Sequence, residues 1–278
     1  MEERATTMPT RKRRGGNDDL MTFGGHLEVL RRMMFRVLGV GCTAAVIVFC
    51  FKDFTWRVLL APSEWDFVTY TWIERLAKAL GMSDFHFGEF HVKLIATDLS
   101  SQFMTHLTTS VYLGLLVASP YILYELFMFV SPALVGNERK YSVKAIVAVY
   151  FLFMAGVLVS YYLLFPISFR FLGTYSVSAK VESTITLDSY VSTFTTLTLM
   201  MGVVFQLPAI SFVLGKLGII NAAVLAKYRK HAFIVILTVA AMITPGQDIL
   251  SLVLVTLPLY LLYEVSIWVV RHSGRPKP

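Results

Sequence analysis

The sequence contains little charge. Only 15% of its 278 residues are Asp, Glu, Lys or Arg, whereas 56% are hydrophobic and the mean hydropathy is +0.64. Soluble domains carry about 25% charged residues, so this composition excludes a soluble domain of the same size. We therefore expect an integral membrane protein.

Cysteine is also scarce, with two residues in the chain. Cys42 and Cys50 lie in the same apolar run and are not positioned to form a disulfide with each other. They belong to no metal-binding pattern, and they do not indicate a redox compartment. We predict that both pack in the core as small apolar residues.

Signatures of catalysis and of nucleic-acid binding are missing. The chain contains neither H-E-x-x-H nor G-x-S-x-G, so we expect no catalytic residues and no enzymatic activity. It also lacks RRM-like and zinc-finger patterns, which argues against nucleic acid as a partner. The run from His86 through Glu89 to His91 lacks a fourth ligand, so we expect neither a metal nor a cofactor.

Long apolar runs dominate instead. They cover residues 33–54, 107–130, 142–165, 191–214, 231–243 and 249–270. About 20 helical residues cross a hydrocarbon layer that is roughly 30 Å thick, and each of the first four runs reaches this length. The sequence predicts an all-α polytopic membrane protein with six transmembrane helices.

The fifth run is short. It has 13 residues before Thr244-Pro245-Gly246, so it spans the bilayer only if residues 228–230 snorkel or the bilayer thins locally. A re-entrant hairpin formed by the fifth and sixth runs is the alternative.

Lys and Arg are distributed unevenly among the connecting segments. Sixteen of them lie in segments 1–32, 131–141, 215–230 and 271–278, and seven lie in segments 52–106, 166–190 and 244–248. Because cytoplasmic loops are enriched in Lys and Arg, we expect an N-in and C-in orientation. The expected organisation is a cytoplasmic tail at 1–25, a membrane domain at 26–270 and a second tail at 271–278. The net charge of +7 then reflects topology and contact with anionic lipids of the bilayer.

The segment 26–32 leads directly into the first apolar run, which has no small-residue cleavage site and is therefore interpreted as a retained span. We expect an amphipathic turn at the membrane surface whose wetter side carries Glu28, Arg31 and Arg32. Two alternatives stay open for this turn. It is either an interfacial anchor, in which Glu28 pairs with one of these arginines, or a functional surface.

A polar connector at 129–141 separates two long apolar runs and carries one acid. Glu138 lies beside Arg139 and Lys140. Cytoplasmic loops of membrane proteins are usually basic, so an acid held between two spans is a candidate group for recognising a cation. The alternative is a solvated charge that pairs with Arg139.

Several polar residues fall in or beside the apolar runs. Glu125 lies about 9 Å from the connector along a helix, so we expect it to face protein or a wet cavity. Gln206 needs a hydrogen-bond partner, supplied either by another span of this chain or by another subunit. Asp248 is suited to cap the N-terminus of the sixth helix, and Glu264 lies toward the inner end of that helix.

Prolines punctuate the expected helices. Pro62 and Pro166 are expected to end helices, and Pro208 to break one, because proline lacks the N–H that continues a helix. Pro120 lies inside the second run, where we expect a kink. The loop that follows Pro62 is rich in aromatic residues, which we interpret as a cap lying on the outer interface.

Seven short motifs, in their order and spacing, resemble one family. They are His26-Leu-Glu-Val-Leu-Arg31, Ala61-Pro62, Ile95-Ala-Thr-Asp98, Ser131-Pro-Ala-Leu134 with Glu138-Arg139, Phe205-Gln-Leu-Pro208, Thr244-Pro245 with Asp248, and Leu262-Tyr-Glu264. Together they resemble the TatC subunit of the twin-arginine protein translocase, over residues 24–270.

The resemblance implies a receptor for the twin-arginine signal peptides of folded precursors at the cytoplasmic face. It implies recruitment of single-span TatA and TatB partners, use of the proton-motive force, and a multi-copy complex in the bacterial inner membrane. The implied signal-peptide-binding residues are His26, Leu27, Glu28, Arg31, Ser131, Pro132, Leu134, Glu138 and Arg139. The implied partner-contact or structural residues are Pro62, Phe129, Gln206, Pro208, Asp248 and Glu264.

Two positions depart from the family's pattern. Its usual acid in the N-terminal motif falls at Val29, whereas this chain has Glu28 one position earlier, a rotation of about 100° on a helix. The family often has Glu where this chain has Gln206, which keeps a hydrogen-bonding group but removes a possible charge. The competing function is a secondary transporter of a small solute, for which we expect repeat symmetry, and we find no repeat.

Overall fold

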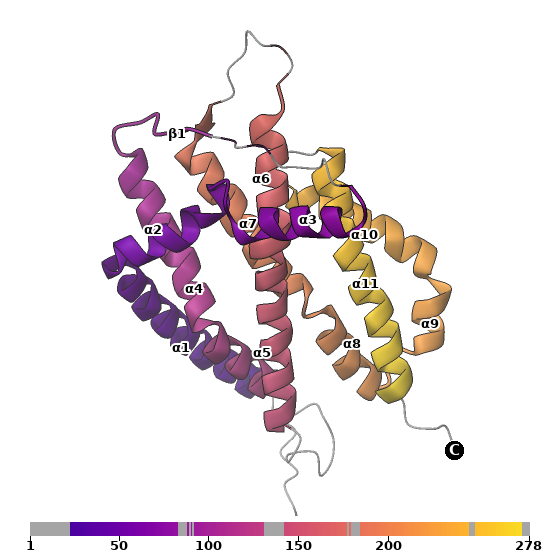
Figure 1. Cartoon of the computed structure of the whole chain (residues 1–278). Coiled ribbons are helices and arrows are strands. Elements are labelled where there is room, and N and C mark those ends of the chain that lie inside the picture. Colours follow the sequence, from indigo (N-terminus) through magenta and orange to yellow (C-terminus); the bar gives the residue numbers. More distant parts are fainter. Residues whose placement is uncertain are drawn as a thin grey trace, which may run out of the picture.

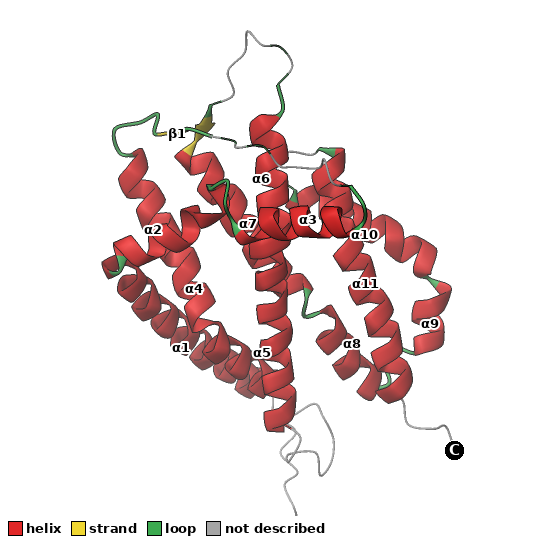
Figure 2. Cartoon of the chain, in the orientation of Figure 1, coloured by secondary structure: helices red, strands yellow, loops and turns green. Residues whose placement is uncertain are grey.

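The computed structural model describes residues 23–82, 88, 90, 92–130, 142–176, 178, 184–244 and 248–273, and most of them are helical (Figure 2). The elements in chain order are α1 (Phe23–Cys50), α2 (Lys52–Leu60), the short 3-10 helix η1 (Ala61–Ser63), α3 (Val68–Ala79), β1 (Leu94–Ile95), α4 (Ser101–Val130), α5 (Ser142–Val159), the π-helical turn η4 (Ser160–Leu164), α6 (Phe165–Thr174), β2 (Ile185–Thr186), α7 (Leu187–Val204), α8 (Leu207–Lys216), α9 (Ala222–Lys227), α10 (Arg229–Ile243) and α11 (Ile249–Ser273).

Long helices run between two ends of the molecule, and α3 lies across them (Figure 1). We call the end at which α1 begins and α4 and α11 end the connector end, and the opposite end the cap end. α1 packs along α4, α5 along α7, and α11 along α8 and α10. At the cap end, β1 and β2 pair in parallel and join the chain before α4 to the start of α7.

Five segments of the described chain are long and apolar enough to cross a membrane. They are Leu27–Cys50, Ser101–Phe129, Ala145–Thr174, Leu187–Lys216 and Ile249–His272. They correspond to five of the six predicted runs. Because the last of them is long enough to cross by itself, the re-entrant alternative is not supported.

The remaining predicted run lies in α10, whose 15 residues extend about 22 Å. Only Tyr228 separates α9 from α10. Its N–H bonds to the Val224 carbonyl, and its own carbonyl accepts from the Ala232 N–H. The helical hydrogen bonds therefore continue across the junction.

Two predicted helix ends are wrong. The first helix ends at Cys50 and not at residue 54, because the backbone breaks at Phe51 (φ −93°, ψ 49°). The third span continues past Pro166 to Thr174, because the π-helical turn η4 comes before the proline. In this turn the Phe165 N–H bonds to the Ser160 carbonyl, five residues back. Pro166 then lies in the first turn of α6, where a missing N–H is tolerated.

Glycines allow the closest helix contacts. A Cβ on Gly114 of α4 would lie 2.5 Å from the backbone N and Cα of Ala45 on α1. A Cβ on Gly156 of α5 would lie 2.5 Å from the carbonyl oxygen of Met201 on α7. Both distances are shorter than van der Waals contact, so these helix pairs approach as only glycine permits, and small residues at helix interfaces are typical of membrane bundles.

An aromatic core fills the cap end, where the sequence predicted an aromatic cap. The hydroxyl of buried Tyr70 lies 2.9 Å from the Pro166 carbonyl oxygen and 3.2 Å from that of Pro62. Burial raises the pKa of Tyr70, so its hydroxyl stays protonated and can donate. The Tyr190 hydroxyl donates to the Leu59 carbonyl over 2.8 Å. Pro62 is thus a buried part of this aromatic core.

Cys42 and Cys50 are free, as predicted, but both are exposed on α1 and neither packs in the core. The prediction of their position was therefore wrong. An exposed face of a membrane helix meets lipid, which accepts a small apolar side chain as readily as a protein core does.

Candidate recognition site

The start of α1 carries Glu28 at the connector end. Arg32 Nη2 donates to Glu28 Oε1 over 3.1 Å, which is the intrahelical pair of the interfacial-anchor alternative. Both side chains are exposed, so this pair contributes little stability and can exchange partners. Leu27 and Arg31 are exposed as well. His26 lies in α1, but its side chain is outside the described part of the structure.

α1 and α4 share a polar contact deeper in the bundle. Arg36 Nη1 lies 3.1 Å from Glu125 Oε1, and the Tyr121 hydroxyl donates to the same oxygen over 2.8 Å. The side chain of Glu125 is 11% exposed and that of Arg36 is 53% exposed. Glu125 therefore faces protein, as predicted, and two donors offset the cost of removing its carboxylate from water.

The register of α1 against α4 places the start of α1 beside the end of α4. Arg36 is opposite Glu125, and nearer the cap end Ala45 is opposite Gly114. Because the helices are antiparallel, each step toward the start of α1 is a step toward the end of α4. The same register brings residues 31–34 of α1 to the last turn of α4, and Glu28 lies about one turn further, beside the point where the polar connector begins.

The connector itself carries most of the predicted recognition residues. Ser131, Pro132, Leu134, Glu138 and Arg139 lie outside the described residues. Phe129, in the last turn of α4, is partly buried. α4 and α5, which the connector joins, pack against each other, so the connector both leaves and returns at the connector end.

Gln206 lies at the break between α7 and α8. Its Nε2 donates to the Val149 carbonyl oxygen on α5 over 3.1 Å, so a neighbouring span of the same chain supplies a partner. Pro208 is buried in the first turn of α8, where it ends the continuity of the helix as the sequence predicted.

Asp248 caps α11. Its Oδ2 accepts a hydrogen bond from the Ser251 N–H over 2.7 Å, which confirms the predicted cap. The Ser251 hydroxyl in turn donates to the Ser168 hydroxyl oxygen on α6 over 3.0 Å. The first turn of α11 is therefore joined to the third span.

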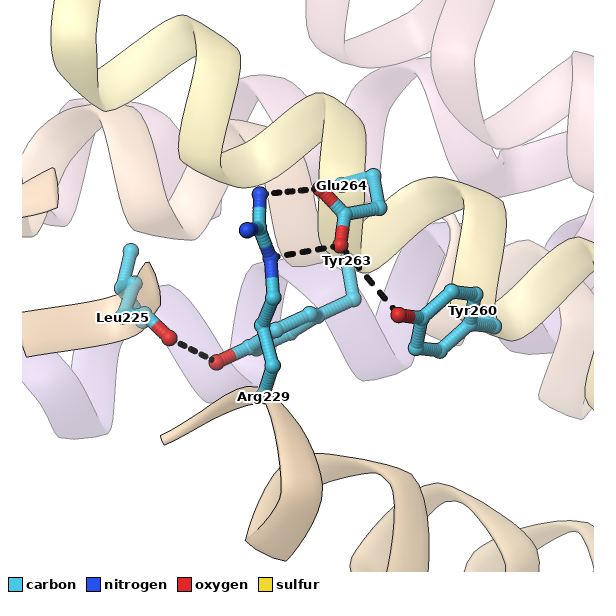
Figure 3. A network of polar contacts seen from close by, with 5 residues as sticks. All are labelled: Leu225, Arg229, Tyr260, Tyr263 and Glu264. Atoms are coloured by element: carbon cyan, nitrogen blue, oxygen red, sulfur yellow. Dashed lines mark hydrogen bonds and ion pairs between the residues drawn. The ribbon is translucent and has the colours of Figure 1, made fainter. Parts of the chain in front are cut away.

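Glu264 belongs to a polar network between α11 and the junction of α9 and α10 (Figure 3). Arg229 Nη2 donates to Glu264 Oε2 over 2.8 Å, and Arg229 Nε lies 2.8 Å from Oε1. The Tyr260 hydroxyl donates to Oε1 over 3.3 Å. The Tyr263 hydroxyl donates to the Leu225 carbonyl over 2.8 Å. Both carboxylate oxygens are occupied, and α11 holds both sides of the junction.

Sequence reasoning missed Arg36, Tyr121 and Arg229 as parts of these contacts. A usable signal was present for Arg36, because an arginine inside an apolar run needs an acidic partner, and Glu125 lies in the next run. In the part of the chain that the structure describes, no group of three or more His, Cys, Asp or Glu residues is placed to hold a metal ion. The described carboxylates Glu28 and Glu125 each pair with an arginine.

Comparisons with known proteins agree on one family. The family model "Sec-independent protein translocase protein (TatC)" matches residues 25–258. The chain is 34% identical over 260 residues to the Sec-independent protein translocase protein TatC of Blattabacterium sp. subsp. Periplaneta americana, covering 92% of this chain and 97% of that protein. It is 32% identical over 260 residues to the protein of the same name from Carboxydothermus hydrogenoformans, covering 94% and 96%.

A solved structure is also similar. The crystal structure of the twin-arginine translocase receptor TatC matches with a TM-score of 0.71 and 27% identity, over 90% of this chain and 100% of that one. The likeness therefore extends over nearly all of both chains.

Proposed function

Because this chain belongs to the TatC family of Sec-independent protein translocase proteins, we propose that it binds the twin-arginine signal peptides of folded precursors. As a member it is an all-α, six-span membrane protein and a receptor subunit of a protein translocase, and it is not an enzyme. We further propose that the connector end and both termini face the cytoplasm, and that the membrane is the inner membrane of a bacterium.

One observation carries the proposed binding site. The register of α1 against α4, fixed by the close approach of Gly114 to Ala45 and by the packing along both helices, brings residues 28–31 to the end of α4. The connector with Glu138 starts there. The start of α1, which carries Glu28, therefore lies beside the point at which the connector begins, and this supports a shared site for a peptide with two adjacent arginines.

The chemistry of arginine gives such a site its specificity. A guanidinium group is planar and presents its donors in a fixed fork, so it can bind a carboxylate through two parallel hydrogen bonds. Lysine offers a compact point charge instead. A receptor that uses carboxylates such as Glu138 and Glu28 therefore distinguishes an Arg-Arg pair from a Lys-Lys pair.

We propose TatA-type and TatB-type single-span proteins as partners, in a multi-copy complex that uses the proton-motive force. Gln206, Asp248 and Glu264 each bond within this chain, which supports structural roles for these three residues. Pro62 and Pro208 are buried, and Phe129 lies at the edge of the connector. Phe129 is only partly buried, as are Asp248 and Glu264.

The test replaces the acids singly and together. Glu138→Gln keeps the size of the side chain and removes its charge. Breaking a hydrogen-bonded charge pair at a partly desolvated site costs roughly 2–5 kcal/mol, so we expect Glu138→Gln to abolish most crosslinking of a twin-arginine peptide in membranes and most export of a folded precursor. We expect a smaller loss for Glu28→Gln.

Glu64→Gln, an exposed acid at the cap end, is the matched control and should leave peptide crosslinking unchanged. Normal crosslinking and export in Glu138→Gln with failure in Glu28→Gln would move the site to the N-terminal segment. Normal behaviour in both single variants and in the double variant would refute recognition by these acids.

A further inference from the structure

Two ion pairs of the described chain join different helices, and they differ in how fully the carboxylate is bound. Arg229 holds Glu264 through both of its oxygens, at 2.8 Å each, and Tyr260 adds a third contact (Figure 3). This pair is closed, because a further cation would find no unoccupied oxygen on Glu264. Such geometry is typical of a structural clamp.

The pair of Arg36 with Glu125 is half open. Arg36 Nη1 and the Tyr121 hydroxyl both contact Oε1, at 3.1 and 2.8 Å. Within the described residues, Oε2 of the same carboxylate has no hydrogen bond and no ion pair. The side chain of Glu125 is only 11% exposed, yet Oε2 is not among the buried, unpartnered side-chain atoms of the described chain, so this oxygen reaches the surface.

A half-bound carboxylate in a poorly hydrated site is suited to one class of ligand. It has a free oxygen that accepts hydrogen bonds, and its charge is stronger at low dielectric than in water. Its resident partner is a guanidinium, which demonstrates that this chemistry fits the site. Arg36 is 53% exposed, so it can swing away, or stay on Oε1 while a second guanidinium binds Oε2.

The site opens toward the proposed peptide-binding surface. Glu125 lies one and a half turns before the end of α4, about 8 Å along the helix. On α1, Arg32 and Arg36 lie on successive turns and each contacts a carboxylate, the first Glu28 and the second Glu125. Carboxylates therefore continue from the exposed start of α1 into the interface between α1 and α4.

We propose that Glu125 accepts a guanidinium group of the bound signal peptide and that Arg36 is a resident competitor for the same carboxylate. This inference rests on the proposed function and deepens it. Glu138 provides the surface contact for the arginine pair, and Glu125 provides a deeper one. Arg36 keeps the acid occupied while no peptide is bound.

The test is a double-mutant cycle that combines variants of the protein with variants of the peptide. The affinity of the full chain in lipid nanodiscs is measured for fluorescent signal peptides that carry Arg-Arg, Lys-Arg, Arg-Lys or Lys-Lys. A hydrogen bond to a charged group is worth enough to change affinity on the order of tenfold. We expect Glu125→Gln to lower the affinity for the Arg-Arg peptide by about that factor. In this variant, lysine in place of the arginine that contacts Glu125 should not weaken binding further, because that arginine has already lost its carboxylate.

Arg36→Gln separates competition from support. If Arg36 competes with the peptide, this variant binds the Arg-Arg peptide at least as tightly as the unaltered chain. If the pair is only a strut between α1 and α4, both variants lose binding together. Glu264→Gln and Arg229→Gln form the matched control pair, and both should leave the ratio of Arg-Arg to Lys-Lys affinity unchanged.

An unchanged affinity ratio in Glu125→Gln, or equal losses in Arg36→Gln and Glu125→Gln, would overturn the inference. Thermal unfolding of each variant in detergent identifies a variant that fails to fold, and the double variant Arg36→Gln/Glu125→Gln then replaces it. Failure of the proposed function looks different. In that case the unaltered chain itself would not prefer the Arg-Arg peptide, and Glu138→Gln would bind the peptides as tightly as the unaltered chain.

Discussion

Gln206 is a polar side chain whose partner depends on the fold. An amide in a membrane helix needs a hydrogen bond, and the sequence allows either another span or another subunit to supply it. The structure brings the Val149 carbonyl, 57 residues earlier, within 3.1 Å of Nε2. The break between α7 and α8 places Gln206 at the start of α8, from where its amide reaches α5. The internal alternative is thereby favoured.

We expect Gln206→Leu to lower the stability of the folded chain by about 0.6–1.7 kcal/mol, the range of hydrogen bonds between membrane helices. Thermal unfolding in detergent measures this loss, and Met200→Leu at an exposed position of α7 is the control that should unfold normally. Crosslinks between a single-span partner and the fourth span should persist in Gln206→Leu. If those crosslinks disappear while stability is unchanged, Gln206 is a partner contact.

Residue contacts could be predicted from the sequence where both partners lie on one turn. The cap by Asp248 follows from helical spacing alone and is confirmed. The pairing of Glu28 with Arg32, which the structure shows, was one of two alternatives that the spacing left open. The contact of Arg36 with Glu125 spans 89 residues. It depends on how α1 and α4 align, which their spacing along the chain does not determine.

Helices could be predicted more reliably than their ends. Hydropathy identified the spans, because each needs about 20 apolar residues. The effect of a proline depends on the backbone around it: α4 continues through Pro120, and a π-helical turn lets the third span continue past Pro166, whereas the chain breaks before Pro208. No residue pattern in the sequence distinguished these cases.

The pairing of α1 with α4 gives a prediction at the scale of helices. A Cβ on Gly114 would lie 2.5 Å from the backbone of Ala45, and backbone cannot move aside as a flexible side chain can. We expect Gly114→Ala to force the two helices apart and to destabilise the fold by about 1–3 kcal/mol, as other overpacked substitutions do. Thermal unfolding in detergent is the measurement.

Gly39 on α1 provides the matched control, because a Cβ there meets no atom within 4 Å. Gly39→Ala should be neutral or stabilising by up to about 1 kcal/mol, since alanine is the better helix former. The two substitutions are chemically identical and should change stability in opposite directions. Equal effects of both would mean that helix propensity, and not the contact of α1 with α4, determines the result.

At the scale of the whole molecule, the fold class and the family followed from the sequence, whereas the geometry of the site did not. Six apolar runs and seven ordered motifs were sufficient for the family, which the comparisons show. The proposed site needs the start of α1 beside the end of α4, and the acid that we propose at its centre, Glu138, lies outside the described residues. The orientation of the molecule in the membrane therefore becomes the decisive test of where that acid acts.

The distribution of Lys and Arg predicts that the connector end faces the cytoplasm, and single-cysteine labelling tests it. Cys42 and Cys50 are exposed on α1, so replacing them leaves no cavity in the core. In that background, Asn137→Cys should react with an impermeant maleimide only after the membrane is opened. Trp65→Cys and Tyr175→Cys, at exposed positions of the opposite end, should react from outside in intact cells. External labelling at Asn137 would place Glu138 on the wrong side for a cytoplasmic signal peptide, and recognition by Glu28, Glu125 and Glu138 would fail together.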